Sequence, residues 1–312
     1  MSFWDLKTAR FLILVLIIFA AILLGVSLPG DSRLIHSIQD SGHFIIFTIL
    51  TLVILSLYRK SEQRTVWLLM LFILLFGVLV EVVQSYIGRE PSLYDLLMDL
   101  LGIAAGAILY AGFFRRSLSW SLSIVILLAF TLTAFSMPLH WFILYQARAS
   151  QFPRLIDVDN LLSRSLLEGS EGGKLRYIEV PENWSLPVDS DIETCAYVSL
   201  HNGSWPGVEI REPEPDWRGY DSLELSIYSD QPEELSLVLR IHDKNHNQVS
   251  DDRYNQNLLL QPGYNHYSLP LSEIVQAPLT RTMEQQAISG VILFAPQKCI
   301  GRSFCLISME LR

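Results

Sequence analysis

The sequence predicts an α plus β multidomain protein, in which five membrane-spanning helices are followed by an antiparallel β-sandwich. Hydrophobic residues make up 50% of the 312 residues, and the mean hydropathy is positive, at +0.32, which is unusual for a soluble chain. The composition changes near residues 147–153. Leu, Ile, Val, Phe and Ala dominate before this boundary, whereas Pro, Asp, Glu, Asn and Ser become common after it.

Five apolar segments in the first 146 residues are candidate membrane spans, because a helix needs about 17 to 25 apolar residues to cross a bilayer. They are residues 11–28, 43–58, 65–86, 96–114 and 119–145. The first segment follows Lys7 and Arg10 and has features of a signal peptide. Its apolar run is long and a second span follows closely, so we interpret it as a retained anchor.

Basic residues predict the orientation of these spans, since Lys and Arg are enriched in cytoplasmic connections. Groups of two or three occur in every second connection, namely Lys7 and Arg10, then Arg59, Lys60 and Arg64, then Arg115 and Arg116, while the alternate connections carry acidic residues beside single arginines. The N-terminus is therefore predicted to lie inside a bacterial cytoplasmic membrane. An odd number of spans places the C-terminal part outside the cell membrane.

The two parts differ in charge. Before residue 147 there are 9 basic and 8 acidic residues, and after it there are 14 basic and 24 acidic residues, so the net charges are +1 and −10. A domain this acidic repels the phosphates of nucleic acid. We therefore predict membrane lipids as partners of the first part and no nucleic-acid partner for either part.

Seven polar residues converge near the predicted outer face of the membrane. They are Asp40, His43, Glu81, Gln84, Arg89, Asp95 and Asp99. An ionisable group at mid-membrane costs roughly 2.5–3.5 kcal/mol, so such residues need either partners or a function. In the first interpretation they neutralise one another and hydrogen-bond between helices. In the second they form an outward-facing pocket for a headgroup or sugar, with Asp40 or Glu81 as base and Arg89 on a phosphate.

Gly102 and Gly106 form a G-x-x-x-G pattern within the fourth apolar segment. Small residues at this spacing let two helix backbones approach closely. The pattern predicts a helix contact, either within the chain or in a homodimer through Gly102 and Gly106.

The runs DSGHFIIFTIL and EVVQSYIGREPSLYDLLMDLLGIAAG, within about residues 31–114, resemble the VanZ-like family. The family pattern has Asp and His before one span, then E-x-x-Q, Arg, Asp and D-x-x-x-N-x-x-G. The matching residues are Asp40, His43, Glu81, Gln84, Arg89, Asp95 and Gly102, whereas Asp99 stands where the family usually has Asn. The resemblance implies an envelope role, linked in the family's namesake to teicoplanin-type glycopeptide resistance, and it implies no reaction.

Short alternating runs from Lys174 to Arg312 predict the β-sandwich, with residues 147–173 as a connector that contains a short helix at 158–167. The nine runs are LRYIEV, CAYVSL, GVEIR, SLELSIYS, ELSLVLRIHD, NQNLLL, HYSLPL, GVILFAP and FCLISMELR. Their order, and the G-x-N-x-x-x-x-P-L turn beginning at Gly263, resemble the galactose-binding-type jelly rolls of carbohydrate-binding modules.

That resemblance implies a sugar site in which aromatic faces cover C–H groups and polar side chains hydrogen-bond to hydroxyls. The candidate ligand-binding residues are Trp205, Trp217, Arg240, Asp243 and Tyr254, with His242 as a further candidate. The alternative is that each tryptophan packs in the core or at its rim and that His242 is structural.

The three cysteines, Cys195, Cys299 and Cys305, all lie in the second part. Cys299 and Cys305 flank a short segment that can turn, so we predict a disulfide between them in an oxidising compartment. Cys195 is then a buried hydrophobic residue. No zinc-type cysteine pair, nucleophile motif or phosphate-binding glycine loop occurs, so the sequence predicts no metal, no cofactor and no enzymatic role for this part.

Three hypotheses follow for the whole chain. The first is an envelope protein without catalysis that binds cell-surface glycan or a lipid-linked sugar. The second is a membrane enzyme that acts on a lipid or lipid-linked headgroup at the polar cluster. The third, a transporter, is disfavoured because five spans without an internal repeat lack the symmetry that alternating access generally uses.

Overall fold

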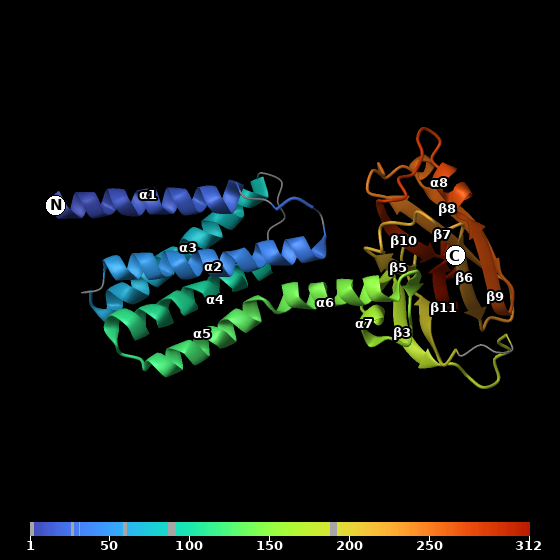
Figure 1. The fold of residues 1–312 in the computed structure, drawn as a ribbon, viewed down its shortest axis with the longest axis horizontal. Coiled ribbons are helices and arrows are strands. Elements are labelled where there is room, and N and C mark those ends of the chain that lie inside the picture. Colours follow the sequence, from blue (N-terminus) through green and yellow to red (C-terminus); the bar gives the residue numbers. More distant parts are fainter. Residues whose placement is uncertain (1–2, 26–27, 31, 59–60, 87–91, 188–191) are drawn as a thin grey trace. The chain divides into compact units, whose positions relative to one another are not determined.

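The computed structural model describes residues 3–25, 28–30, 32–58, 61–86, 92–187 and 192–312, with side chains from residue 10 onward. The chain divides into two compact units, Met1–Phe142 and Ile143–Arg312. The first unit is helical, and the second is built mainly of strands (Figure 1).

Six helices and one π-helical turn extend from the N-terminus to the sandwich. They are α1 (Phe3–Gly25), α2 (Arg33–Leu57), α3 (Gln63–Tyr86), α4 (Leu93–Tyr110), η1 (Ala111–Arg115), α5 (Trp120–Ala134) and α6 (Ser136–Gln151). Helix α2 begins well before the span predicted at residue 43, because Ser32 caps its first turn by accepting a hydrogen bond from the Ile35 N–H. Asp40 therefore lies within the helix and does not precede it.

Three of these helices are long and apolar enough to cross a membrane, which supports the prediction of a membrane protein. They are α2, α3 and α4 extended through η1. Helices α5 and α6 pass the same test only as a pair, and the described part of α1 from Arg10 to Gly25 is apolar but shorter. By length and composition, the described residues thus contain three candidate spans, or four if the bent pair counts as one.

The predicted span at residues 119–145 is broken, since α5 and α6 meet at an angle of 48°. Pro138 has no N–H to donate to the Ala134 carbonyl one turn earlier. The Ser41 hydroxyl of α2 donates to that carbonyl instead, over 2.7 Å. A side chain from a neighbouring helix thus satisfies the backbone group that proline leaves free.

The two glycines of the G-x-x-x-G pattern are buried against α2 of the same chain. A Cβ atom at Gly102 would lie 2.6 Å from the Phe44 carbonyl oxygen, and one at Gly106 would lie 2.6 Å from the Thr48 carbonyl oxygen. This contact occupies the glycine faces that a homodimer through Gly102 and Gly106 would use. The intramolecular alternative is the one that the structure contains.

The second unit is a sandwich of two antiparallel sheets. Sheet A has the order β3-β4-β11-β6-β9, with β1 also pairing with β11, and sheet B has the order β2-β5-β10-β7-β8. The strands of sheet A are β1 (Arg154–Ile156), β3 (Gly173–Glu179), β4 (Thr194–Leu200), β6 (Ser222–Ser229), β9 (Gly263–Pro270) and β11 (Ser303–Leu311). Those of sheet B are β2 (Leu167–Ser170), β5 (Gly207–Arg211), β7 (Leu235–Asp243), β8 (Tyr254–Leu260) and β10 (Ile288–Phe294).

The nine runs read from the sequence correspond to strands β3 to β11, which confirms the prediction of an antiparallel sandwich. Strands β1 and β2 lie in the stretch predicted as a connector and belong to the two sheets. The helix in that stretch, α7 (Leu161–Arg164), is a single turn. Alternate residues of each strand enter one continuous core between the sheets.

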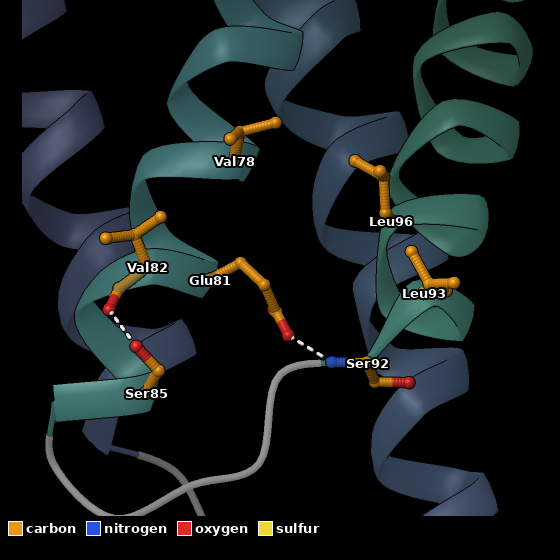
Figure 2. Close-up of a pocket in the computed structure, with 7 residues that line it drawn as sticks. All are labelled: Val78, Glu81, Val82, Ser85, Ser92, Leu93 and Leu96. Atoms are coloured by element: carbon orange, nitrogen blue, oxygen red, sulfur yellow. Dashed lines mark hydrogen bonds between the residues drawn. The ribbon is translucent and has the colours of Figure 1, made fainter.

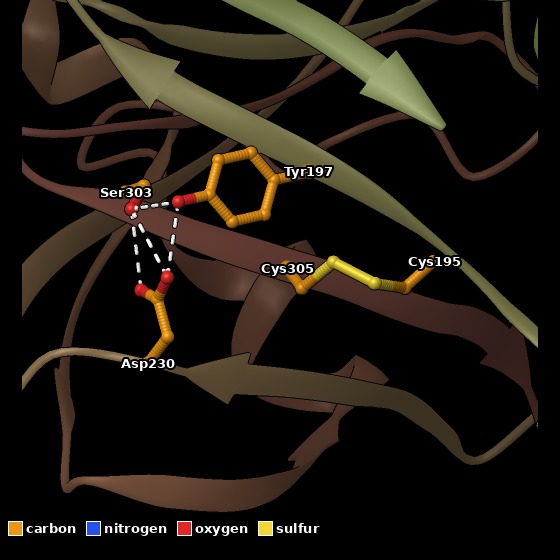
Figure 3. The surroundings of a disulfide bond; sticks show 5 residues. All are labelled: Cys195, Tyr197, Asp230, Ser303 and Cys305. Carbon is orange, nitrogen blue, oxygen red and sulfur yellow. Dashed lines mark hydrogen bonds between the residues drawn. A yellow bond between two sulfur atoms is a disulfide. The ribbon is translucent and has the colours of Figure 1, made fainter. Parts of the chain in front are cut away.

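The disulfide joins Cys195 to Cys305, and Cys299 is free and buried (Figure 3). The prediction of a Cys299–Cys305 bond is therefore wrong. Cys195 and Cys305 lie on neighbouring strands, with Cα atoms 5.8 Å apart, on the face of sheet A that points away from the core. Cys299 packs on the other side of that sheet, inside the core, so closeness in sequence does not bring its sulfur near Cys305.

We predict that removing the disulfide with Cys195→Ser destabilises the second unit by about 2–4 kcal/mol, because the bond closes a long loop. That loop separates the two cysteines by 110 residues. The measurement is denaturant unfolding of the full chain, followed by tryptophan fluorescence. Cys299→Ser is the control and should retain the disulfide. If denatured, unreduced protein exposes Cys195 or Cys305 to alkylation, the pairing is refuted.

Candidate functional sites

The polar cluster of the helical unit is centred on a buried histidine and aspartate. His43 of α2 and Asp99 of α4 approach to 2.9 Å, from Nδ1 to Oδ1, and their side chains are only 6% and 5% exposed. Gly77 of α3 makes room for the carboxylate, since a Cβ atom there would lie 2.6 Å from Asp99 Oδ2. Three helices therefore meet at this pair, and the carboxylate fixes the orientation of the imidazole.

Asp95 lies one turn before Asp99 on α4 and is 5% exposed. Its carboxyl group is within hydrogen-bonding reach of Asp40. Two carboxylates this close repel one another when both are ionised. Asp95 Oδ1 has no hydrogen-bond partner in the described part of the chain, so the cluster contains a buried acceptor that remains to be satisfied.

Glu81 and Gln84 of α3 point to different partners. Glu81 Oε1 accepts from the Ser92 N–H over 2.5 Å, at the N-terminus of α4 (Figure 2). Gln84 Nε2 donates to the Leu23 carbonyl at the end of α1, over 3.1 Å. The structure thus brings Asp40, His43, Asp95 and Asp99 together and uses Gln84 to join α1 to α3. Arg89 lies outside the described residues.

A small hollow between α3 and α4 leads to Glu81. Its volume is about 210 Å³ and its wall is mostly apolar. The lining residues are Val78, Glu81, Val82, Ser85, Ser92, Leu93 and Leu96 (Figure 2). Within this hollow the Glu81 side chain accepts from the Ser92 N–H at the start of α4.

A second cavity opens in the sandwich, on the outer face of sheet A, and its volume is about 430 Å³. It is lined by seven polar side chains and four apolar ones. The polar residues are Arg154, Asp157, Asp159, Thr194, Ser308, Glu310 and Arg312, and the apolar ones are Ile156, Val158, Ile192 and Ile307. Positively charged donors and negatively charged acceptors therefore surround one cavity. Its volume lies within the range of small-molecule sites, which is roughly 300–1,000 Å³.

A β-bulge in β11 shapes the floor of this cavity. The pairing of β11 with β6 shifts register between Leu306 and Ser308. Ile307 packs in the outer cluster of sheet A, whereas Leu306 and Met309 enter the core. Because a bulge places two residues of one strand opposite one residue of its partner, both Ile307 and Ser308 line the cavity.

The segment between β3 and β4 covers the adjacent part of the same face. Trp184 stacks on Tyr228 of β6, with ring centroids 3.9 Å apart and planes at 5°. Val180, Leu186 and Ile192 pack with them around the Cys195–Cys305 disulfide. The disulfide thus anchors the sheet beneath this cover, beside the open cavity.

A hydrogen-bonded network continues from the cavity floor onto β6 and β9. Glu224 lies opposite Glu310 in the register and accepts from Ser222 and Ser268. His266 Nε2 lies 2.9 Å from Glu224 Oε2, and its Nδ1 lies 3.2 Å from the Ser226 hydroxyl. Burial alone would raise the pKa of Glu224, but the two serine hydrogen bonds and His266 hold the pKa below its usual value.

Three of the sugar-binding candidates named from the sequence are buried, so they have no surface to offer a ligand. Trp217 is 1% exposed and its Nε1 donates to the Glu214 carbonyl. Asp243 accepts two hydrogen bonds from Arg281, at 2.6 and 2.7 Å. Burial raises the pKa of Tyr254 to about 12.

The remaining candidates lie on or near the outer face of sheet B. Trp205 is 53% exposed and contacts Phe294 edge to face, at 5.4 Å. Arg240 and His242 alternate outward on β7 while Leu239 and Ile241 enter the core. None of these residues lines the cavity on sheet A. The cavity residues had no common signal in the sequence, except that Asp157 and Asp159 stand in a polar turn.

No group of three or more His, Cys, Asp or Glu side chains arranged to hold a metal ion occurs among the residues that the structure describes. The cavity's carboxylates are instead interspersed with arginines. Side chains of this kind can hydrogen-bond to a ligand that has both donors and acceptors.

The fold and its sites define a class, namely a chain with apolar helices followed by an antiparallel jelly-roll-like sandwich. No family model matches the chain, and no curated protein matches it. Solved structures similar to it include a family 11 carbohydrate-binding module from Clostridium thermocellum in complex with a β-1,3-1,4-mixed-linked tetrasaccharide. The two are 15% identical with a TM-score of 0.34, and the match covers 46% of this chain and 86% of the module.

Two larger proteins are similar over part of their length. An exo-β-agarase is 12% identical with a TM-score of 0.41, and the match covers 51% of this chain and 25% of that protein. An arabinose-bound α-L-arabinofuranosidase is 12% identical with a TM-score of 0.36, over 51% of this chain and 26% of that protein. Similarities of this extent assign no ligand to this chain.

We predict that the second unit loses stability as the pH falls from about 6.5 to about 4 and that His242 accounts for part of this loss. Burial, and then the nearby charges of Arg240 and Arg253, lower the pKa of His242 from 6.5 to about 4. In that window the unfolded chain binds a proton that the folded chain does not, so protonation favours unfolding.

The measurement is the free energy of unfolding against pH, for the unsubstituted chain and for His242→Gln. The variant should show a shallower slope between pH 6.5 and 4 and the same slope above pH 7. Equal slopes in both proteins across the whole range would contradict the burial of a neutral imidazole.

Proposed function

We propose that this chain is a multi-pass membrane protein that binds envelope glycan in the cavity on sheet A. The observation that carries the proposal is the lining of that cavity. Sugar hydroxyls donate to the carboxylates of Asp157, Asp159 and Glu310, and they accept from Arg154. The partly exposed Ile192 provides apolar contact for the C–H face of a sugar ring, whereas Ile156, Val158 and Ile307 are buried.

The charges of the cavity favour a ligand without net charge. Arg312 is already ion-paired with Glu310, over 2.7 Å. Three carboxylates and two arginines leave the hollow slightly acidic, so an anionic ligand is repelled and an uncharged polyol is accepted. A neutral hexose or oligosaccharide therefore fits the hydrogen-bonding pattern better than a phosphorylated one.

We further propose five spans, with the N-terminus in the cytoplasm and the sandwich outside a bacterial cytoplasmic membrane. The described part of α1 and the bent pair α5 and α6 would supply the first and last spans beside the three longer helices. The alternating basic connections support this orientation. The Cys195–Cys305 disulfide supports it as well, since disulfides persist in oxidising compartments.

The glycan proposal predicts that Ser308→Trp weakens binding about tenfold or more, equivalent to about 1.4 kcal/mol, because an indole would fill the cavity floor. The measurement is the affinity of the full chain in nanodiscs for soluble peptidoglycan, mixed-linked β-glucan, galactan and mannan. The matched control is Ser272→Trp, which alters an exposed serine of α8 (Leu271–Gln276).

Two outcomes would remove the proposal. One is that the unsubstituted chain binds none of the four polysaccharides. The other is that Ser308→Trp and Ser272→Trp bind with equal affinity. The melting temperature of each variant shows whether the sandwich is folded, so a loss of binding is separable from a loss of structure.

The helical cluster favours a second candidate function, which is chemistry on a lipid or lipid-linked headgroup. The specific observation is the buried His43, held by Asp99 beside a carboxyl oxygen that lacks a partner. An imidazole oriented by a carboxylate is the usual arrangement of a general base. The VanZ-like resemblance adds a proposed link to teicoplanin susceptibility.

This second function predicts that His43→Ala abolishes any change in teicoplanin susceptibility that expression of the chain produces. Asp99→Asn should reduce the effect only in part, because an amide still orients the imidazole. Ser56→Ala is the control, since the Ser56 hydroxyl donates to the Val53 carbonyl of its own helix, away from the cluster. If His43→Ala changes teicoplanin susceptibility as much as the unsubstituted chain does, at equal amounts of protein in the membrane, chemistry at this cluster is excluded.

A further inference from the structure

The outer face of sheet B carries a group of basic side chains within a strongly acidic domain. Arg240 and His242 lie two residues apart on β7 and therefore point to the same side. Arg253 immediately precedes β8, and the pairing of Ile241 with Tyr254 places it beside His242. The connection between β7 and β8 adds His246, whose ring centroid lies 5.0 Å from that of His242.

The two arginines of this group form no direct ion pair in the described part of the chain, although the charge of Glu209 on β5 acts on Arg240 from a longer distance. Within the described part of the chain, neither Arg240 nor Arg253 has a carboxylate within the 4.0 Å of an ion pair. Arg253 donates to Asn255 Oδ1 over 3.2 Å. Six of the other arginines of the same unit are ion-paired, namely Arg148, Arg211, Arg218, Arg281, Arg302 and Arg312.

The guanidinium of Arg240 has a hydrogen-bond partner for one of its nitrogens and lacks one for another. One of its terminal nitrogens, Nη2, lies 3.1 Å from His246 Nε2. Because a guanidinium only donates, that histidine nitrogen is the acceptor and His246 is neutral. The Nε of Arg240 is buried and has no partner among the described residues.

His242 presents a second buried nitrogen without a partner. A Cβ atom on Gly290 would lie 2.7 Å from the Nε2 and 3.1 Å from the Nδ1 of His242. Glycine at position 290 therefore lets the imidazole lie close against β10. Its Nδ1 has no hydrogen-bond partner in the part of the chain that the structure describes.

Unpaired, partly buried cations destabilise a fold, because burial removes water that would otherwise solvate the charge. An oxyanion bound between them would restore the lost interactions. The planar guanidinium matches the two oxygens of a carboxylate or phosphate. Apolar surface adjoins this group on the same face, since Ile292 lies opposite Arg240 and Phe294 lies two residues further along β10.

We propose that the outer face of sheet B binds an oxyanion carried by a sugar, with Arg240 and Arg253 in contact with its oxygens and His242 donating to it. Trp205 and Phe294, which contact each other at 5.4 Å, supply an aromatic surface for the sugar ring. This inference rests on the proposed function only in taking glycan as the ligand class. The site lies on the opposite sheet from the cavity.

The test measures binding of galacturonic acid, glucose 6-phosphate and glucose to the full chain in detergent, at ionic strength matched with NaCl. Galacturonic acid or glucose 6-phosphate should bind, and glucose should not bind at this face. The double variant Arg240→Gln and Arg253→Gln should weaken anion binding about tenfold or more. Binding of only one acid would identify the oxyanion as a carboxylate or as a phosphate.

Two further variants separate charge from folding. Arg240→Lys keeps the charge but loses Nε, so it should weaken binding less than the double variant does. Arg218→Gln removes an exposed arginine that is ion-paired with Asp216 and should leave binding unchanged. The melting temperature without ligand reports whether each variant is folded.

The proposal is overturned if neither acid binds, or if the double variant binds them as tightly as the unsubstituted chain. Its failure is distinguishable from that of the neutral-glycan proposal. Ser308→Trp should leave the binding of galacturonic acid or glucose 6-phosphate unchanged, and the arginine variants should leave the binding of neutral polysaccharide unchanged.

Discussion

The pairing of buried polar groups is the constraint on which both units depend. A donor or acceptor removed from water costs about 1–3 kcal/mol when it lacks a partner. In the helical unit, Ser41 satisfies the carbonyl that Pro138 leaves free, and His43 is held by Asp99. In the sandwich, Arg281 joins Asp243 to Asp252 and thereby fixes the connections at one end of sheet B. Groups left without a partner are therefore informative, and the clearest are Asp95 Oδ1, Arg240 Nε and His242 Nδ1.

Much of the fold could be predicted from the sequence, because its periodicities are strong. The nine runs with alternating apolar and polar residues correspond to strands. The core lies on one side of each sheet, so every second side chain of a strand is apolar. The start of α2 was missed because hydropathy rewards apolar residues, whereas Ser37 and Ser41 are polar residues on the buried side of that helix. The break between α5 and α6 had a signal in Pro138. It was overlooked because the apolar run continues through it.

The two sites differed in how far they could be predicted. His43, Asp95 and Asp99 could be grouped because residues three or four apart share a helix face and the spans had a predicted direction. The cavity on sheet A could not be grouped, because Arg154, Thr194 and Glu310 come from three strands whose adjacency depends on register. The predicted pairing of Cys299 with Cys305 was wrong for the same reason. Sequence separation says how far a chain can reach, but it does not say on which side of a sheet a side chain lies.

The cavity on sheet A and the basic group on sheet B thus differ in charge and are separated by one core. Sheets pack about 10 Å apart, which is close to the Debye length of about 8 Å at physiological ionic strength. The acidic residues around the cavity therefore act on the basic group of sheet B only through a screened, long-range field. Arg240 and Arg253 attract an anion over contact distances, while the net charge of −10 repels it from afar. Added salt weakens both effects. An acidic domain that binds an anion in this way selects for close geometric fit over charge alone.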